Sequence, residues 1–118
     1  SSILVKNHPN GGRKFFVVPS DTDLGFISKK FGVTEKQLVK WNELDNFKIR
    51  KNDVLFLEPK SSSGNVATYK AQSGEDMHDI SQKFGIKLSK LYAKNRMNEG
   101  QQPKSGQLIY LQQKKPKS

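Results

Sequence analysis

The chain has 118 residues, a formal net charge of +10 at pH 7, 33% hydrophobic residues and no cysteine. The absence of cysteine excludes disulfide bonds, and the two histidines, His8 and His78, lack the neighbouring ligands of a zinc site. No segment approaches the roughly 20 apolar residues that span a bilayer. We therefore expect no metal, no cofactor and no membrane span, and the positive charge favours polyanions such as nucleic acid, anionic membranes or charged wall polymers.

The sequence contains an internal repeat. The segment 26–33 (FISKKFGV) returns as 79–86 (DISQKFGI), and the correspondence runs from Phe16/Tyr69 to Leu57/Leu111. Such a period predicts two copies of one small module, each with its own core. The predicted organisation is a leader or hairpin arm at 1–13, a first module at 14–60, a flexible polar linker at 61–66, a second module at 67–113 and a frayed basic tail at 114–118.

The first predicted elements are strands. The Val- and Phe-rich segment 14–18 is typical of a strand. Upstream of it, Asn10-Gly11 is a strong hairpin signal, and it lies between the apolar segments 3–5 and 15–17. The pattern predicts an extra N-terminal strand on the sheet of the first module, with a disordered leader as the alternative.

Two short helices follow in the first module. The first is indicated by an apolar stripe at helical spacing, formed by Leu24, Ile27 and Phe31. Asp23 can cap the start of this helix, and Gly32 can adopt the left-handed conformation that ends it. Thr34 and Gln37 form a capping-box pattern, which predicts a second helix that reaches to about Asn42.

The second module repeats these helices with one difference. Its apolar stripe is formed by Met77, Ile80 and Phe84. Asp76 and Gly85 are the corresponding cap and stop signals. Lys87 occupies the position of Thr34, so the second helix of this module should begin without a side-chain cap.

Closing strands complete both modules. Strands are predicted at 54–57 and 108–111, each after a tight turn that contains Asn or Gly, and 67–71 corresponds to the opening strand. Each module therefore has the order strand, helix, helix, strand. The predicted fold class is α+β, with two small modules in tandem.

Several motifs in this order resemble the lysin motif, LysM. Residues 73–77 (SGEDM) resemble the family's opening Gly-Asp-Thr-Leu, and 105–108 (SGQL) resemble its Pro-Gly-Gln-Leu. Residues 42–44 (NEL) and 95–97 (NRM) resemble its Asn-x-Leu. The resemblance covers nearly all of both modules. The pair is similar to those that trail bacterial cell-wall glucosaminidases.

The resemblance implies a beta-alpha-alpha-beta fold that binds N-acetylglucosamine-containing glycans, either peptidoglycan or chitin. The implied groove lies between the strand-to-helix turn and the loop after the second helix. In the first module this gives Ser20, Asp21, Thr22, Asp23, Leu44, Asp45 and Asn46. In the second module it gives Ser73, Gly74, Glu75, Asp76, Met97, Asn98 and Glu99.

The types of these residues suit an acetamido sugar, but they also have ordinary structural explanations. The sugar offers one N–H, one C=O and one methyl group, which turn backbone and a small apolar floor of Leu44 or Met97 can match. Alternatively, Asp23 and Asp76 are helix caps, and Leu44 and Met97 are core residues.

The first module departs from the family pattern at the implied site. Asp21 stands where the family has Gly, and Asp23 stands where it has Thr or Ser. The added Cβ and charge of Asp21 hinder a close approach of sugar to the backbone, whereas the second module keeps Gly74. The sequence therefore favours the second site over the first.

Two other function classes stay open at this stage. The segment 27–38 also fits a helix-turn-helix, with Gln37 and Lys40 on a recognition helix that binds nucleic acid. The flanking strands argue against this, because a helix-turn-helix normally packs on a third helix. Catalysis by paired carboxylates, Glu75/Asp76 or Glu43/Asp45, is disfavoured because a shallow groove gives little burial to raise an acid's pKa.

We therefore expect a monomeric, non-catalytic binding fragment that anchors an attached hydrolase to the cell wall, with no specific binding of nucleic acid. Two weak sites on one chain gain from effective concentration when both reach the same polymer. Because Ser1 is not a start methionine, we expect a piece of a longer protein. Its expected location is the cell envelope or the extracellular space.

Overall fold

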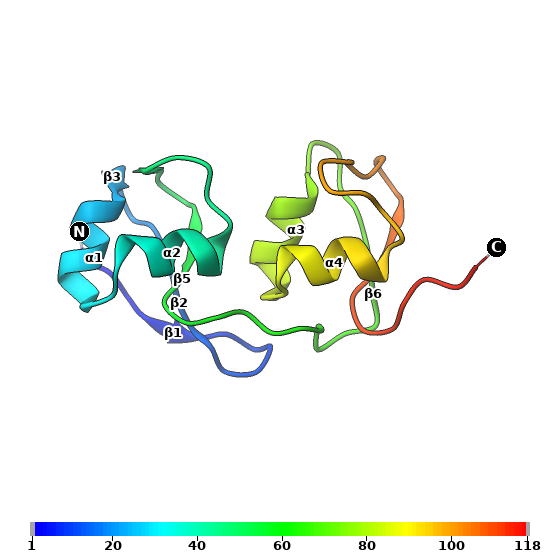
Figure 1. The fold of residues 1–118 in the computed structure, drawn as a ribbon, viewed down its shortest axis with the longest axis horizontal. Helices are drawn as coiled ribbons and strands as arrows, with labels where there is room; N and C mark the ends of the chain where they lie inside the picture. The colour runs from blue at the N-terminus through cyan, green and yellow to red at the C-terminus, as the bar shows by residue number, and fades with distance from the viewer. Residues whose placement is uncertain (1, 118) are drawn as a thin grey trace. The chain divides into compact units, whose positions relative to one another are not determined.

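The computed structural model describes residues 2–117, and the chain divides into two compact units, Ser1–Lys60 and Ser61–Ser118 (Figure 1). Each unit combines two short helices with antiparallel strands in the part of the chain that the structure describes. The predicted α+β class and the tandem arrangement are confirmed.

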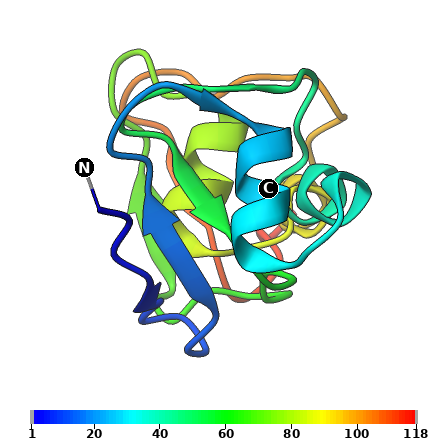
Figure 2. The same ribbon diagram turned by 90° about the vertical axis from the view of Figure 1, so that its left-hand side faces the viewer.

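The first unit is built around a three-stranded antiparallel sheet of order β1-β2-β5. Its elements are β1 (Lys6–Asn7), β2 (Lys14–Val17), β3 (Thr22–Asp23), α1 (Leu24–Phe31), α2 (Glu35–Asn42), β4 (Lys48–Ile49) and β5 (Val54–Phe56). In Figure 2, the arrows of β2 (blue) and β5 (green) lie side by side, next to α1 (cyan). The short strands β3 and β4 form a separate pair, which the sequence did not predict.

The predicted N-terminal strand is present, but it begins at Lys6 and not in the apolar segment 3–5. Its position follows from the turn, where the His8 N–H donates to the Arg13 carbonyl at 2.7 Å. This bond sets the register, in which Asn7 pairs with Lys14. The apolar segment therefore lies upstream of the paired residues, and its Ile3 packs against the core.

The predicted helix signals of the first unit are confirmed. The Asp23 carboxylate accepts a hydrogen bond from the Phe26 N–H at 3.0 Å, and Gly32 ends α1 with φ 67°. Thr34 and Gln37 form both hydrogen bonds of a capping box. Helices of this length are marginal alone, so packing against the sheet supplies most of their stability.

The second unit repeats the arrangement on a two-stranded sheet. Its elements are β6 (Thr68–Lys70), α3 (Met77–Phe84), α4 (Leu88–Lys94) and β7 (Leu108–Tyr110). β6 and β7 are antiparallel, with Tyr69 opposite Ile109. Asp76 caps α3 and Gly85 ends it with φ 68°. As predicted, Lys87 gives α4 no side-chain cap.

Each unit has its own hydrophobic core. The buried core of the first unit consists of Phe16, Val18, Leu24, Ile27, Leu38, Ile49, Leu55 and Leu57. The buried core of the second consists of Ala71, Met77, Ile80, Ile86, Leu91, Tyr92, Ile109 and Leu111. The last residues of the two predicted apolar stripes, Phe31 and Phe84, are half-buried at the edge of these cores.

A buried asparagine at the end of the second helix joins each helix pair to its sheet. The Asn42 side chain accepts from the Phe56 N–H at 2.7 Å and donates to the Phe56 carbonyl at 2.9 Å. Asn95 makes the same two bonds with Tyr110, at 2.7 and 2.9 Å. These side chains pair with main chain that faces away from the neighbouring strand.

The segments predicted as an open linker and a frayed tail are hydrogen bonded within the second unit. The Ser61 N–H donates to the Gly85 carbonyl at 2.9 Å, and the Gly64 N–H donates to the Leu111 carbonyl at 2.7 Å. In the tail, the Lys115 carbonyl accepts a hydrogen bond from Arg96 Nε at 2.7 Å. The structure thus differs from the expectation of free segments at 61–66 and 114–117.

Candidate functional site

The two segments implied as a groove in the first unit lie on loops that are joined by main-chain hydrogen bonds. Segment 20–23 connects β2 to α1, and segment 44–46 connects α2 to β4. Strand β3 pairs with β4, and the Leu24 N–H donates to the Phe47 carbonyl at 3.0 Å. The structure therefore brings these loops together, but it uses the backbone of Thr22 and Asp23 to do so.

The polar side chains of these first-unit loops mostly serve the fold. Asp21 accepts a hydrogen bond from the Lys51 N–H at 2.8 Å, and Asp23 caps α1. Asn46 donates to the Asp45 carboxylate at 3.0 Å. Leu44 is half-buried against the core. Among the candidate residues, this leaves the exposed Ser20 and the half-buried Thr22 with side-chain hydroxyls at the surface.

In the second unit, a side chain in place of a strand pair ties the corresponding loops together. The Met77 N–H donates to Gln102 Oε1 at 2.7 Å. Gln101 Oε1 in turn accepts from the Asn98 N–H at 2.6 Å and shapes the loop after α4. No sequence signal indicates the role of Gln102, because its contact spans 25 residues and belongs to no local motif.

Two glycines leave the second-unit loops open. Gly74 has φ 84° and Gly100 has φ 92°, and no atom lies within 4 Å of the place where a Cβ would stand on either. Within residues 2–117, no protein group accepts a hydrogen bond from the N–H of Gly74, Glu99 or Gly100. In the repeat, Asp21 and Phe47 occupy the positions of the two glycines, so the first unit carries side chains there.

The other second-unit candidates divide between structural and exposed positions. Glu75 accepts hydrogen bonds from the Tyr69 hydroxyl and the Gln72 N–H, both at 2.7 Å. Asp76 caps α3, and Met97 is half-buried against the core. The remaining candidates are exposed at the surface: Ser73, Gly74, Asn98 and Glu99. Both structural explanations offered by the sequence, helix caps and core residues, therefore apply.

The carboxylates of this region belong to helix capping. Asp76 and Asp79 exchange capping-box hydrogen bonds of 2.7 and 3.0 Å with each other's N–H groups. Burial raises the pKa of Asp79, and the Asp76 charge beside it raises it further. Among residues 2–117 there is no cluster of three His, Cys, Asp or Glu side chains placed to hold a metal ion.

The helix pairs do not have the surroundings of a helix-turn-helix. Both pairs accompany antiparallel strands, and the described residues contain no third helix in either unit. No helix within 2–117 is long and apolar enough to cross a membrane. The arrangement that recurs in both units is a strand-to-helix turn held against the loop after the second helix.

Comparison with curated proteins finds relatives among bacterial cell-wall enzymes. The chain is 27% identical over 109 residues to a protein named membrane-bound lytic murein transglycosylase D from Escherichia coli, covering 87% of this chain and 24% of that protein. It is 26% identical over 103 residues to N-acetylmuramoyl-L-alanine amidase sle1 of Staphylococcus aureus, covering 75% and 31%. The chain thus spans about a quarter to a third of the length of these relatives.

Comparison with solved structures finds the spore cortex-lytic enzyme SleL of Bacillus cereus, with a TM-score of 0.38 and 22% identity over 86% of this chain and 23% of that one. The family comparison is more specific. The sequence model of the LysM domain matches twice, at residues 17–57 and 69–112, where the structure has its two strand, helix, helix, strand units. The chain belongs to the LysM domain family, in two adjacent copies.

Proposed function

We propose that this chain is the wall-binding part of a bacterial cell-wall hydrolase and that its second unit carries the main site for N-acetylglucosamine-containing glycan. LysM domains are binding modules for peptidoglycan and N-acetylglucosamine in cell-wall enzymes, and they are not themselves catalytic. The names of the relatives, a murein transglycosylase and an N-acetylmuramoyl-L-alanine amidase, support a peptidoglycan ligand. The cell envelope or its exterior follows as the proposed location.

The observation that carries this proposal is the pair of open glycines, Gly74 and Gly100, on the two loops that Gln102 ties together. Their N–H groups can donate to the carbonyl of an acetamido group, and no side chain at either position blocks the approach. Met97 and Asn98 lie on the second of these loops and offer an apolar and a polar contact. A shallow site of this kind binds weakly, because few atoms of the sugar are desolvated.

The first unit is proposed as the weaker partner. Its main-chain groups at Thr22 and Asp23 already pair with β4, and the Asp21 carboxylate is bound to the Lys51 N–H. Two linked sites of unequal strength still raise the affinity for a polymer, because the second binding event becomes intramolecular. The attached hydrolase would be held at its substrate by this pair, with the chain itself acting as a monomer.

The proposal is tested by titrating the isotopically labelled chain with N-acetylglucosamine oligomers and recording amide shifts by NMR. We expect the largest shifts at 73–76 and 97–100 and smaller shifts at 20–23 and 44–46. Addition of salt should change the affinity little, since the ligand is neutral, whereas nucleic-acid binding would weaken steeply. Shifts confined to the exposed lysines, or a steep salt dependence, would contradict the proposal.

A matched pair of glycine variants separates binding from stability. Gly74 and Gly106 have φ 84° and 83°, and a Cβ added to either glycine would meet no atom within 4 Å. Replacing either by alanine should therefore strain the backbone by a similar amount, roughly 1 kcal/mol. Only Gly74 lies at the proposed site, so Gly74→Ala should weaken oligomer binding while Gly106→Ala leaves it unchanged. Equal affinities of the two variants would refute the placement.

A further inference from the structure

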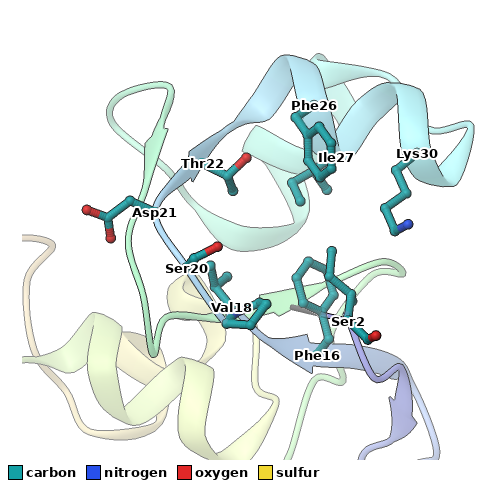
Figure 3. A pocket seen from close by; sticks show the side chains of 11 residues that line it. Ser2, Phe16, Val18, Ser20, Asp21, Thr22, Phe26, Ile27 and Lys30 are labelled. Carbon is teal, nitrogen blue, oxygen red and sulfur yellow. The ribbon is translucent and has the colours of Figure 1, made fainter.

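A cavity of about 470 Å³ lies in the first unit between α1 and β2 (Figure 3). It is lined by the turn 20–22 and by α1 and β2 residues, and no described residue of the loop 44–46 contributes to it. It is therefore a different place from the groove between the two loops. Its volume is within the range of about 300–1,000 Å³ that is typical of small-ligand sites.

The cavity has an apolar interior and a polar rim. Phe16, Val18 and Ile27 form its floor, and Phe26, 54% exposed, is a wall on the solvent side. In Figure 3, Phe26, Ile27 and Lys30 project from α1 on one side, and Phe16 and Val18 lie on the other. The remaining polar groups of the rim come from Ser2, Ser20 and Thr22.

Lys30 is the charge that this cavity offers to a ligand. The Asp21 carboxylate is bound to the Lys51 N–H at 2.8 Å, and in Figure 3 it points away from the cavity. Within the described residues 2–117, the Lys30 ammonium has no ion pair and no hydrogen-bond acceptor. A ligand that fills the cavity therefore meets an uncompensated cation at one end.

The second unit shows which chemistry this place accepts. There the positions of Phe16, Thr22 and Lys30 are taken by Tyr69, Glu75 and Lys83. The Glu75 carboxylate accepts a hydrogen bond from the Tyr69 hydroxyl at 2.7 Å, and that hydroxyl accepts from Lys83 Nζ at 2.9 Å. The Lys83 ammonium also lies 4.5 Å from the centre of the Tyr69 ring.

This chain of contacts satisfies the lysine of the second unit internally. The hydrogen bond with Tyr69 raises the pKa of Lys83, and the Glu75 charge contributes in the same direction. In the first unit, Phe16 has no hydroxyl and Thr22 has no carboxylate. The same structural position thus holds a built-in carboxylate in one copy and leaves a lysine and a cavity in the other.

We propose that the cavity of the first unit binds a carboxylate-bearing peptide, namely the alanine-containing stem that is attached to the muramoyl groups of peptidoglycan. The peptide carboxylate would pair with Lys30, on the side of the cavity where the second unit carries Glu75. An alanine methyl group fits against the apolar floor, and the Ser20 and Thr22 hydroxyls can donate to peptide carbonyls. This inference rests on the proposed function, in which the glycan of the same polymer binds to the loops.

The test uses N-acetylmuramoyl-L-alanyl-D-isoglutamine, which carries one free carboxylate, and the same compound with that carboxylate converted to an amide. Each is titrated into the labelled chain, as are N-acetylglucosamine oligomers. The acid should shift the amides of Thr22, Phe26 and Lys30. Lys30→Gln should weaken it about fivefold, as expected for an exposed ion pair of about 1 kcal/mol. The amide should bind the wild-type chain about as weakly.

Lys29→Gln is the matched control, because Lys29 is the exposed neighbour on α1 that does not line the cavity. It makes the same change in net charge and should leave the affinity for the acid unchanged. Equal weakening by both variants, equal binding of acid and amide, or shifts outside the cavity would each overturn the inference. Oligomer binding at 73–76 without dipeptide binding would refute the peptide site alone, whereas loss of oligomer binding would refute the proposed function.

Discussion

Asn42 should be one of the most sensitive positions for the stability of the first unit. The Leu57 N–H donates to the Lys14 carbonyl, so in this antiparallel ladder the alternate residue Phe56 directs its N–H and C=O away from β2. Those two groups are bound by the Asn42 side chain, which also donates to the Leu38 carbonyl at 3.0 Å. Asn42 and Phe56 are both fully buried.

Replacing Asn42 with alanine removes these three hydrogen bonds and leaves Phe56 main-chain groups without their partner. A buried unsatisfied donor or acceptor costs roughly 1–3 kcal/mol, so we expect a loss of about 3 kcal/mol. A unit of this size is stable by only about 3–9 kcal/mol. Asn42→Ala should therefore bring the first unit close to unfolding. Asn42→Asp, which keeps the volume but not the donor, should be nearly as damaging.

The assay uses a spectroscopic label that the sequence already provides. Trp41 is the only tryptophan and lies in α2 of the first unit, whereas the three tyrosines lie in the second. Urea unfolding followed by tryptophan fluorescence therefore reports the first unit. Asn7→Ala, at an exposed position of β1, should change the unfolding free energy by less than about 0.5 kcal/mol. A loss below about 1 kcal/mol for Asn42→Ala would refute the reasoning.

Three further substitutions give simpler expectations. Gly64→Ala would place a Cβ 3.0 Å from the Leu111 Cβ, so it should destabilise the second unit by about 1–3 kcal/mol, measured by NMR signals of its tyrosines during unfolding. Thr34→Ala removes an α2 cap and should lower the unfolding free energy of the first unit by about 1 kcal/mol in the tryptophan assay. Burial lowers the pKa of Lys60 from 10.5, although Glu43 opposes this shift. Because the unfolded chain then binds more protons just below pH 10.5, stability should rise with pH there, and Lys60→Met should abolish that rise in urea titrations.

The parts of the fold that the sequence predicted are those with local signals. Asp23, Gly32 and the Thr34–Gln37 box act within a few residues of their own positions, so their types reveal their roles. The apolar stripes of the helices are equally local. For the same reason, the absence of a side-chain cap at Lys87 could be predicted.

The parts that the sequence did not reveal depend on contacts between distant residues. Strands β3 and β4 have two residues each, too few for a periodic pattern, and they exist because the loops meet. Gln102 reaches Met77 across 25 residues. Gly64 indicates a flexible linker by its type, yet its missing side chain is needed for close packing against Leu111. The assignment of glycan contacts to the loop residues stays a prediction.

The asparagine at the end of each second helix grips atoms that every amino acid shares. Its partners are the amide and carbonyl of Phe56 in one copy and of Tyr110 in the other, so the identity of the strand residue does not matter to the grip. A protein engineer could therefore vary the closing strand at this position and graft new surface chemistry there, provided that the amide side chain opposite is left untouched.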